Sequence, residues 1–496
     1  MSKEIELKLA LPPTAVAALR AHPLLAGAES FGPPQQLENT YFDNAALDLR
    51  RERIALRLRK AGALWLQTIK CAASSLGGLS SRPEWEQPWN GESFDFSAIE
   101  AEAVRTRLEA MRDELQPTFT TDFARETWRL APRAGVTVLA MLDQGEVRAA
   151  GRTAPISELE LELESGEASD LLALARALAA DLPLLPEDTS KAQRGYALFH
   201  DAKPGARHAG ESRIKSGQDA LSAFRTIAFD GLAHWQANAQ GVLRGEAESV
   251  HQSRVALRRL RTAVALFADP LPEAWATEWR ERLGQLAGEL GASRDADVVL
   301  QTLVDPVLAD TSRGDDLERL AERLRQHRGQ RQDDNPHPGA ALLAFAEALH
   351  ALPESGGGPV DALAEEALRK IRRKSRQSVR EIEDGDVAQL HRLRIRLKRL
   401  RYGLDFFAPL WPGKRLASFQ KKLTALQDDL GQVNDAVTGN RLLAELAGED
   451  PGLVAARAFI AGWHAPRVEK LRRRGLRRAR SLLWDTPPWK HADKDD

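Results

Sequence analysis

Two different periods of hydrophobic and polar residues divide the chain. Near the N-terminus charged and apolar residues alternate, as in Glu4-Ile5-Glu6-Leu7-Lys8, so that a strand would carry its charges on one face. From about residue 216 onward apolar residues recur at spacings of three and four, with many Ala and Leu, as in helices. The pattern predicts an α+β protein, with a β-rich N-terminal domain followed by an all-helical one.

Further strand-like stretches follow the first at short intervals. With the first, the predicted strands are residues 4–9, 37–43, 53–60, 65–70, 82–86, 119–130, 136–142 and 156–164. Eight strands are enough for a small closed antiparallel barrel. Helices are expected near residues 95–114 and 168–180, and Asp143-Gln144-Gly145 is interpreted as a turn.

The most regular strand has the sequence SELELELES at residues 157–165. One of its faces carries Glu158, Glu160, Glu162 and Glu164. Such a row of like charges is tolerated on a solvated face, but it also offers the hard oxygen ligands that divalent cations prefer. Basic residues at the same period on other strands would suit a polyphosphate chain; they are Lys8, Arg57, Arg59 and Lys70. Taken alone, the first strand is a half-buried edge strand with exposed charges, whereas these complementary faces favour a closed sheet with its charges inside.

Composition and charge limit the protein class. The chain has 496 residues, 28% of them charged and 43% hydrophobic, which is typical of a globular protein with two or three domains. We find neither a signal-peptide pattern nor a membrane-spanning run, and the single cysteine, Cys71, cannot form an internal disulfide. These features predict a cytoplasmic protein without a membrane partner. The net charge of −1 argues against a general nucleic-acid-binding protein, although strongly basic segments could bind a smaller polyanion.

An internal repeat organises the helical half. His251 and His391 begin similar basic segments 140 residues apart, and Leu290-Gly291 and Leu430-Gly431 have the same offset. On a helix each basic segment forms one stripe; the two stripes are His251, Arg254, Arg258 and Arg261, and His391, Arg394, Lys398 and Arg401. A charge run is usually a solvated face. The repetition, with few interleaved acids, favours stripes that face a shared anion.

The N-terminal motifs resemble the CYTH, or triphosphate tunnel, family in their order over about residues 1–200. They are Glu4-x-Glu6-x-Lys8, Leu56-Arg57-Leu58-Arg59, Trp65-x-Gln67-Thr68-Ile69-Lys70, Arg82-Pro83-Glu84-Trp85-Glu86, Arg125, Leu142-Asp143-x-Gly145, the acidic strand and Ser190-Lys191-Ala192-x-Arg194-Gly195-Tyr196. The resemblance implies an eight-stranded antiparallel tunnel with flanking helices at residues 1–202. It also implies a bound triphosphate, with Mg²⁺ or Mn²⁺ on the acidic side.

The resemblance further implies roles for individual residues. The predicted catalytic residues are Lys8, Lys70 and Lys191. The predicted substrate-binding residues are Arg57, Arg59, Arg125 and Arg194. The predicted metal ligands are Glu4, Glu6, Glu160, Glu162 and Asp143, with Glu86 a weaker candidate. Direct metal-assisted hydrolysis is favoured over a covalent intermediate, because no histidine or serine nucleophile stands out in these motifs. A metal-bound carboxylate and a deprotonated lysine are both open as the general base.

The helical half resembles the CHAD family through its paired basic segments. The resemblance implies a duplicated all-α domain at residues 216–490, with four-helix repeats at about 216–350 and 360–490, that binds inorganic polyphosphate in a basic channel. The predicted polyphosphate-binding residues are His251, Arg254, Arg258, Arg261, Arg294, His391, Arg394, Lys398 and Arg401. Asn434 stands where the first repeat has Arg294, so the two repeats are not equivalent.

The pairing of the two resemblances predicts an enzyme that hydrolyses inorganic triphosphate to diphosphate and phosphate. The helical domain would bind polyphosphate and could target the protein to polyphosphate granules. Thiamine triphosphate and nucleoside triphosphates stay open as substrates, and adenylate cyclase activity is less favoured because no nucleobase-reading feature is found. The competing hypothesis is a non-catalytic polyphosphate-binding protein, against which the inward carboxylates argue.

Overall fold

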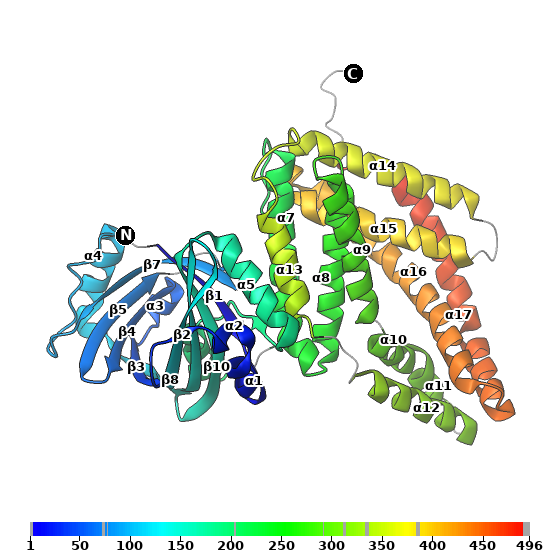
Figure 1. Cartoon of the computed structure of the whole chain (residues 1–496). Coiled ribbons are helices and arrows are strands. Elements are labelled where there is room, and N and C mark those ends of the chain that lie inside the picture. Colours follow the sequence, from blue (N-terminus) through cyan, green and yellow to red (C-terminus); the bar gives the residue numbers. More distant parts are fainter. Residues whose placement is uncertain are drawn as a thin grey trace, which may run out of the picture. The chain divides into compact units, whose positions relative to one another are not determined.

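The computed structural model describes residues 3–71, 75–76, 78–202, 205–290, 292–310, 314–332, 337–382 and 387–489. The chain divides into two compact units, which we call the tunnel unit and the helical unit. The tunnel unit comprises Met1–Gly205 and His337–Leu352, and the helical unit comprises Ala206–Pro336 and Pro353–Asp496. Figure 1 shows the strands in the first unit and the long helices in the second.

The strands of the tunnel unit belong to one antiparallel sheet. They are β1 (Lys3–Ala10), β2 (Glu29–Ser30), β3 (Gln35–Asp43), β4 (Ile54–Ala61), β5 (Leu64–Cys71), β6 (Ser75–Leu76), β7 (Leu79–Pro88), β8 (Gln116–Arg133), β9 (Val136–Ala149), β10 (Arg152–Ser165) and β11 (Leu185–Pro186). The strand order is β11-β1-β10-β9-β8-β3-β4-β5-β7-β6, and β1 also pairs with β7. This second pairing joins the strands next to the two ends of the path, so the eight strands from β1 to β7 along it form a closed ring, as predicted.

Helices cover the outside and one end of this ring. They are α1 (Val16–Ala21), α2 (Pro23–Ala26), α3 (Asp48–Arg51), α4 (Glu102–Met111), α5 (Ala168–Asp181), α6 (Lys191–Phe199) and α13 (Gly339–His350), with 3₁₀ turns at Pro13–Ala15 and Arg112–Glu114. The leucines that alternate with the charges on β1 and β10, such as Leu7 and Leu161, are fully buried. Helix α5 packs on these two strands with Leu171 and Leu178 in its buried face. The apolar core beneath α5 therefore lies outside the ring, and the charges that alternate with these leucines point inward.

The interpretation of Asp143-Gln144-Gly145 as a turn was wrong. These residues lie within β9, where Gly145 is paired with Phe123 on β8 and Ile156 on β10. A Cβ atom at Gly145 would lie 2.5 Å from the Cα of Phe123. Glycine is required here because the neighbouring backbone approaches closely, which is a known role of glycine inside a strand.

The helical unit is built of helices, as predicted, and its division into two repeats stays a prediction. Its helices are α7 (Ala220–Leu243), α8 (Ala247–Leu266), α9 (Glu273–Glu289), α10 (Ala292–Val299), a π-helix (Leu300–Val304), α11 (Asp305–Asp310), α12 (Asp315–Gln332), α14 (Val360–Glu381), α15 (Val387–Phe407), a 3₁₀ turn (Ala408–Leu410), α16 (Lys414–Ala447) and α17 (Pro451–Trp484). The two basic stripes lie on α8 and α15. The repeats differ where α9 ends at Glu289, because α16 continues without a break through the matching Leu430.

In the described residues, no helix combines the length and the apolar character that a bilayer span needs.

Candidate functional site

The pairing of strands places the predicted charges on the inner face of the ring. Residues directly opposite each other in an antiparallel pair lie on the same face of the sheet. Glu6 is opposite Glu162, and Lys8 is opposite Glu160. Continuing around the ring, the opposite pairs are Glu158 and Asp143, Arg125 and Asp143, Tyr41 and Arg57, Arg57 and Thr68, and Lys70 and Glu84. The sheet therefore encloses a charged tunnel.

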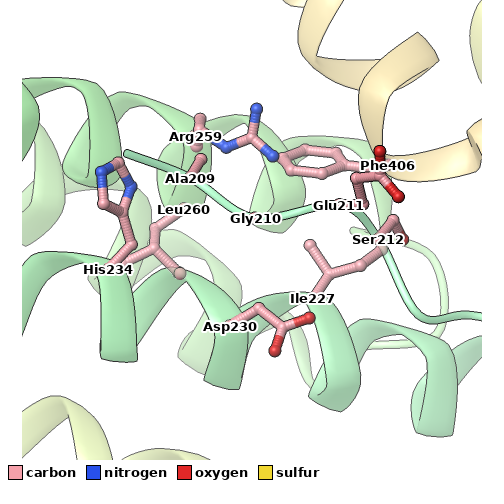
Figure 2. Close-up of a pocket in the computed structure, with 11 residues that line it drawn as sticks. Ala209, Gly210, Glu211, Ser212, Ile227, Asp230, His234, Arg259, Leu260 and Phe406 are labelled. Atoms are coloured by element: carbon pink, nitrogen blue, oxygen red, sulfur yellow. The ribbon is translucent and has the colours of Figure 1, made fainter. Parts of the chain in front are cut away.

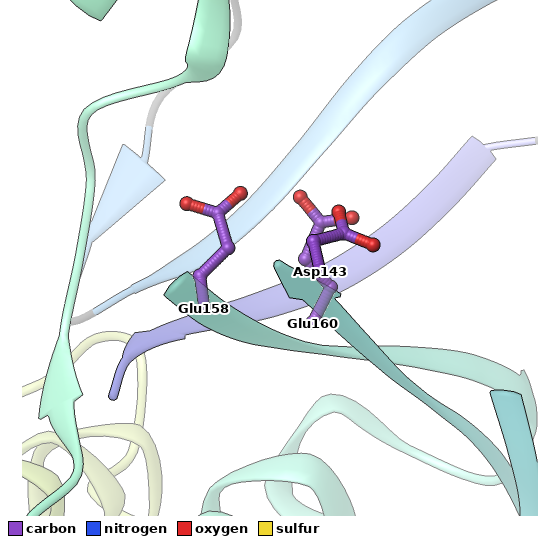
Figure 3. A group of neighbouring side chains, drawn as sticks. All are labelled: Asp143, Glu158 and Glu160. Atoms are coloured by element: carbon purple, nitrogen blue, oxygen red, sulfur yellow. The ribbon is translucent and has the colours of Figure 1, made fainter. Parts of the chain in front are cut away.

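Lys191 enters this tunnel from the first turn of α6. Ser190 caps the helix in a reciprocal capping box with Gln193, which fixes where the helix begins. The Nζ atom of Lys191 lies 2.6 Å from Asp143 Oδ2 and 3.0 Å from Glu160 Oε1, and it also contacts Glu158. Figure 3 shows these three carboxylates, which come from β9 and β10.

Glu160 is the most highly connected carboxylate of the tunnel. Besides Lys191, it contacts Arg125 at 2.6 Å and Lys8 at 3.5 Å. Burial alone would raise the pKa of Glu160, but the charges of Lys191, Arg125 and Lys8 hold that pKa well below its ordinary value. Arg125 also bonds both oxygens of Asp143, which is fully buried. Glu160 is therefore ionised and shared by three cations.

A second group of ion pairs lines the opposite wall. Lys70 lies 2.7 Å from Glu84, which is also 3.9 Å from Arg57, and Arg59 lies 3.7 Å from Glu86. Burial, together with the charges of Arg57 and Arg125, lowers the pKa of Arg59 to about 10. This wall carries more positive charge than its carboxylates balance, which favours an anion.

Glu6 and Glu162 form an acidic pair that suits a divalent cation. Glu6 accepts a hydrogen bond of 2.9 Å from the Ser80 hydroxyl. Burial raises the pKa of Glu162, and the negative charge of Glu6 adds to the increase although Lys70 opposes it. Like charges directly opposite in a sheet are destabilising, so an ion with carboxylate ligands would relieve this repulsion. The oxygens of Asp143, Glu158 and Glu160 also lie within 4.8 Å of one another, close enough to hold a metal.

Aromatic side chains pack together beside α6. The ring of Phe119 stacks on Tyr41 with centroids 4.5 Å apart and meets Tyr196 at 4.9 Å. An added Cβ at Gly195 would lie 2.2 Å from Phe119, so glycine allows α6 to approach this closely. The Tyr196 hydroxyl donates a hydrogen bond of 2.8 Å to the buried carboxylate of Asp43. Together these contacts fix α6, and with it Lys191.

The two basic stripes of the helical unit form a cation cluster between α8 and α15. Burial and the charges of Arg394 and Arg258 lower the pKa of Lys398 to about 7. His391 Nδ1 lies 2.6 Å from Asn434 Oδ1, and Arg394 lies 3.7 Å from Asp435. We call Arg258, Arg394, Lys398 and Arg401 the basic cluster. Several cations lie near Lys398, and among the described contacts little negative charge balances them. Such an excess of positive charge favours the binding of an anion.

Both units match known families. The model of the CYTH domain matches residues 2–196, and the model of the CHAD domain matches residues 226–444. The chain is a CYTH domain followed by a CHAD domain. This confirms both resemblances inferred from the sequence motifs.

Several known proteins are similar to parts of this chain. An inorganic triphosphatase of Haemophilus influenzae is 32% identical over 202 residues, which are 40% of this chain and about half, 55%, of that protein. An uncharacterised protein of Mycobacterium tuberculosis is 27% identical over 408 residues, 75% of each chain. The crystal structure of the CHAD domain from the plant Ricinus communis shares 28% identity and a TM-score of 0.50, and the match covers 58% of this chain and 99% of that one.

The CYTH domain brings most of the predicted site residues together. Those whose contacts meet in the tunnel are Glu6, Lys8, Arg57, Arg59, Lys70, Arg125, Asp143, Glu160, Glu162, Lys191 and Arg194. The side chain of Glu4 lies outside the described residues. Sequence reasoning left Glu158 out of the metal set, yet this fully buried carboxylate contacts both Lys191 and Arg194. The alternation of the acidic strand was the signal that could have included it.

The CHAD domain places its predicted residues along two facing stripes. The positive charge of Arg258 on α8 contributes to the lowered pKa of Lys398 on α15, and the charge of Arg261 contributes to the lowered pKa of Arg399. His251 and Arg254 lie on α8 and are half-buried, whereas His391 is exposed and bonds Asn434. The side chain of Arg294 lies outside the described residues. The roles of all these residues in binding stay predictions.

A shallow pocket elsewhere in the CHAD domain lies beneath the linker Ala209–Ser212 (Figure 2). Its most buried cation, Arg259, lies 3.3 Å from Asp405 and over the ring of Phe406. His234 Nε2 bonds the carbonyl oxygen of Arg207 at 3.0 Å. The Arg259 contacts join α8 to α15, and the bond from His234 holds the start of the linker on α7, so we assign the pocket a structural role.

Proposed function

We propose that the CYTH domain is a metal-dependent triphosphatase that hydrolyses inorganic triphosphate to diphosphate and phosphate. The observation that carries this proposal is the closed tunnel in which cations and carboxylates alternate around Glu160. The similarity to the Haemophilus inorganic triphosphatase supports the choice of substrate.

The ion pairs explain why a metal and a triphosphate would enter together. Lys8, Arg125 and Lys191 are bound to Glu160, so a triphosphate alone would have to separate them from a carboxylate. A metal–triphosphate complex carries both signs of charge. Its phosphoryl oxygens can replace the carboxylates as partners of the cations, while the released carboxylates face the metal. The exchange keeps every buried charge paired, which a buried site requires.

The residues of the tunnel would have different roles in hydrolysis. Lys8, Arg57, Arg59, Lys70, Arg125 and Lys191 would neutralise phosphoryl charge and hold the chain in line for attack by water. Glu6 and Glu162, with Glu160 and Asp143, would hold Mg²⁺ or Mn²⁺ through oxygen ligands. The ion would supply Lewis-acid neutralisation of the reacting phosphate. The tunnel contacts offer two groups for accepting the proton from water, a carboxylate of this set and a lysine.

We further propose that the CHAD domain binds inorganic polyphosphate at the basic cluster. Phosphate chains present negative charge at regular intervals, and the two stripes present cations at intervals of about one helical turn. Binding there would raise the concentration of phosphate chains near the enzyme or place the protein on polyphosphate granules.

Rates of phosphate release test the first proposal. We expect rapid release from inorganic triphosphate with Mg²⁺, slower release from thiamine triphosphate and ATP, and loss of release with EDTA. Equal or faster use of ATP would overturn the substrate assignment. Metal-independent release would overturn the metal assignment. Binding of triphosphate and polyphosphate without any release would favour the binding-protein alternative.

A further inference from the structure

Helix α13 belongs to the CHAD domain by its sequence but to the tunnel unit by its contacts. Its residues, Gly339–His350, lie within the stretch that matches the CHAD domain, residues 226–444. In the structure, His337–Leu352 group with Met1–Gly205 instead. The chain thus leaves the helical unit, contributes one helix to the tunnel unit and returns.

Helix α13 packs against α5 and β11. Its buried residues are Gly339, Leu342, Leu343, Phe345, Ala346 and Leu349. An ion pair of 2.5 Å joins Glu347 on α13 to Arg176 on α5. A helix so rich in buried apolar residues is a built part of the unit in which it packs.

The first residue of α13 approaches the tunnel unit more closely than any side chain would allow. A Cβ atom at Gly339 would lie 1.8 Å from the carbonyl oxygen of Leu184. This oxygen belongs to the backbone, so it cannot turn away as the end of a side chain can. Glycine at this position therefore sets the distance between α13 and the residue that precedes β11.

The segment that follows Leu184 leads directly to the tunnel lysines. Strand β11 pairs with β1 at Leu9 and Ala10, and the backbone N–H of Glu187 donates a 2.9 Å hydrogen bond to the carbonyl oxygen of Lys8. Ser190 then caps α6, whose first residue is Lys191. Residues 184–191 thus run from the contact with α13, past Lys8, to Lys191.

We propose that α13 is a positioning element for the tunnel site, and that Gly339 is its positioning residue. By packing on Leu184 and β11, the helix holds the segment from which Lys191 reaches Asp143, Glu158 and Glu160. A helix supplied by the CHAD part of the chain is therefore needed for phosphate hydrolysis in the CYTH part. This inference rests on the proposed triphosphatase activity.

The substitution of Gly339 by alanine, which adds one methyl group, tests the inference in the full-length chain. Gly339→Ala should move Leu184 and β11 away from α13 while favouring the helix itself, because alanine is the better helix former. A misplacement of about 1 Å can cost about 100-fold in rate, so we expect kcat for inorganic triphosphate to fall at least about tenfold. The matched control is Gly288→Ala in α9, where an added Cβ meets nothing within 4 Å. Its kcat and KM should equal those of the wild type.

A charge-reversal pair provides an independent test if Gly339→Ala fails to fold. Glu347→Arg and Arg176→Glu each place like charges between α13 and α5. Each variant should lower kcat, and the double variant should restore it. A helix that only stabilises the fold would change the melting temperature and leave kcat and KM unaltered well below that temperature.

The outcomes separate this inference from the proposed function. Wild-type protein that releases no phosphate from triphosphate would refute both, since nothing would be left to position. If the wild type is active and Gly339→Ala folds with unchanged kcat and KM, the inference is overturned while the proposed function stands. If Gly339→Ala is unfolded, unchanged kinetics in both single charge reversals would overturn it. Lowered kcat with rescue in the double variant would support it.

Discussion

The tunnel and the basic cluster both concentrate positive charge, but they balance it differently. In the tunnel, Lys191 and Arg125 each touch at least two carboxylates, and Glu160 is shared by three cations. In the basic cluster, burial and the charges of Arg394 and Arg258 outweigh that of Asp435 and lower the pKa of Lys398 to about 7. A site that contains both signs of charge suits a ligand that brings both, such as a metal–triphosphate complex. A site of mostly one sign suits a bare polyanion.

The largest expected effect comes from removing the shared carboxylate. Glu160→Gln keeps the shape of the side chain but removes the negative charge that Lys8, Arg125 and Lys191 share. We expect kcat for triphosphate to fall by at least about 100-fold, the scale for loss of one electrostatic group in an active site. Steady-state phosphate release measures this, with circular dichroism as a check on the fold.

Glu164→Gln on the same strand is the matched control. Glu164 is the last carboxylate of the acidic row and pairs with the half-buried Arg129, outside the shared network. We expect its rate to stay within about twofold of wild type, as for most surface changes. If Glu160→Gln turns over triphosphate at the wild-type rate, the shared carboxylate is not what distinguishes the tunnel from the basic cluster.

The next effect is on the basic cluster. Arg258→Ala combined with Arg401→Ala removes one cation from each stripe. The affinity for long-chain polyphosphate should fall about tenfold or more, and the salt dependence of binding should weaken by roughly one to two units of log–log slope. Triphosphate turnover should be unchanged. Fluorescence anisotropy with labelled polyphosphate at several salt concentrations measures the affinity.

Arg441→Ala provides the control for this pair. Arg441 is exposed on α16 and lies 3.7 Å from Glu445. It should bind polyphosphate as the wild type does. Equal loss of affinity in Arg441→Ala would mean that the whole basic surface, and no particular cluster, holds the chain.

A pH effect should distinguish the two regions more finely. Lys398 is charged below about pH 7 and neutral above it, and a bound polyanion favours the charged form. Polyphosphate affinity should therefore fall as pH rises from 6 to 8, by up to about tenfold for one charge-assisted contact. Lys398→Arg should remove most of this dependence. Titration calorimetry at both pH values measures it, and an equally steep pH dependence in the variant would assign the effect to another group.

The smallest expected effect is on thermal stability. Mg²⁺ should raise the melting temperature of the wild type by a few degrees, because an ion that binds only the folded tunnel stabilises it. Glu162→Gln should lose most of the shift, since the repulsion with Glu6 would already be relieved. Asp435→Asn in the CHAD domain should keep it. Differential scanning calorimetry with and without Mg²⁺ checks all three, and an unchanged shift in Glu162→Gln would place the ion elsewhere.

Local periodicity accounts for what the sequence predicted well. A strand has a period of two, so the alternation in β1 and β10 determines which residues share a face. The inward direction of Glu6, Lys8 and Glu160 could therefore be predicted once complementary strands were found. The 140-residue offset likewise predicted the duplicated helices, because His251 and His391 mark equivalent helical positions.

Contacts between distant segments account for what the sequence did not show. Asp143-Gln144-Gly145 has the composition of a turn, and only the close approach of Phe123 reveals why β9 contains glycine there. Glu158 is distinguished from its neighbours by Lys191 and Arg194, which arrive on a separate helix. The apolar pattern of α13 predicts that it is buried, but the pattern does not identify α5 and β11 as the surface that buries it.

The most direct measurement is the fate of inorganic triphosphate followed by phosphorus NMR with full-length protein and Mg²⁺. We predict that the triphosphate signals disappear while diphosphate and phosphate appear in equal amounts, and that EDTA stops the change. An unchanged spectrum, while calorimetry shows that triphosphate binds, would contradict it and leave a protein that holds phosphate chains without cleaving them.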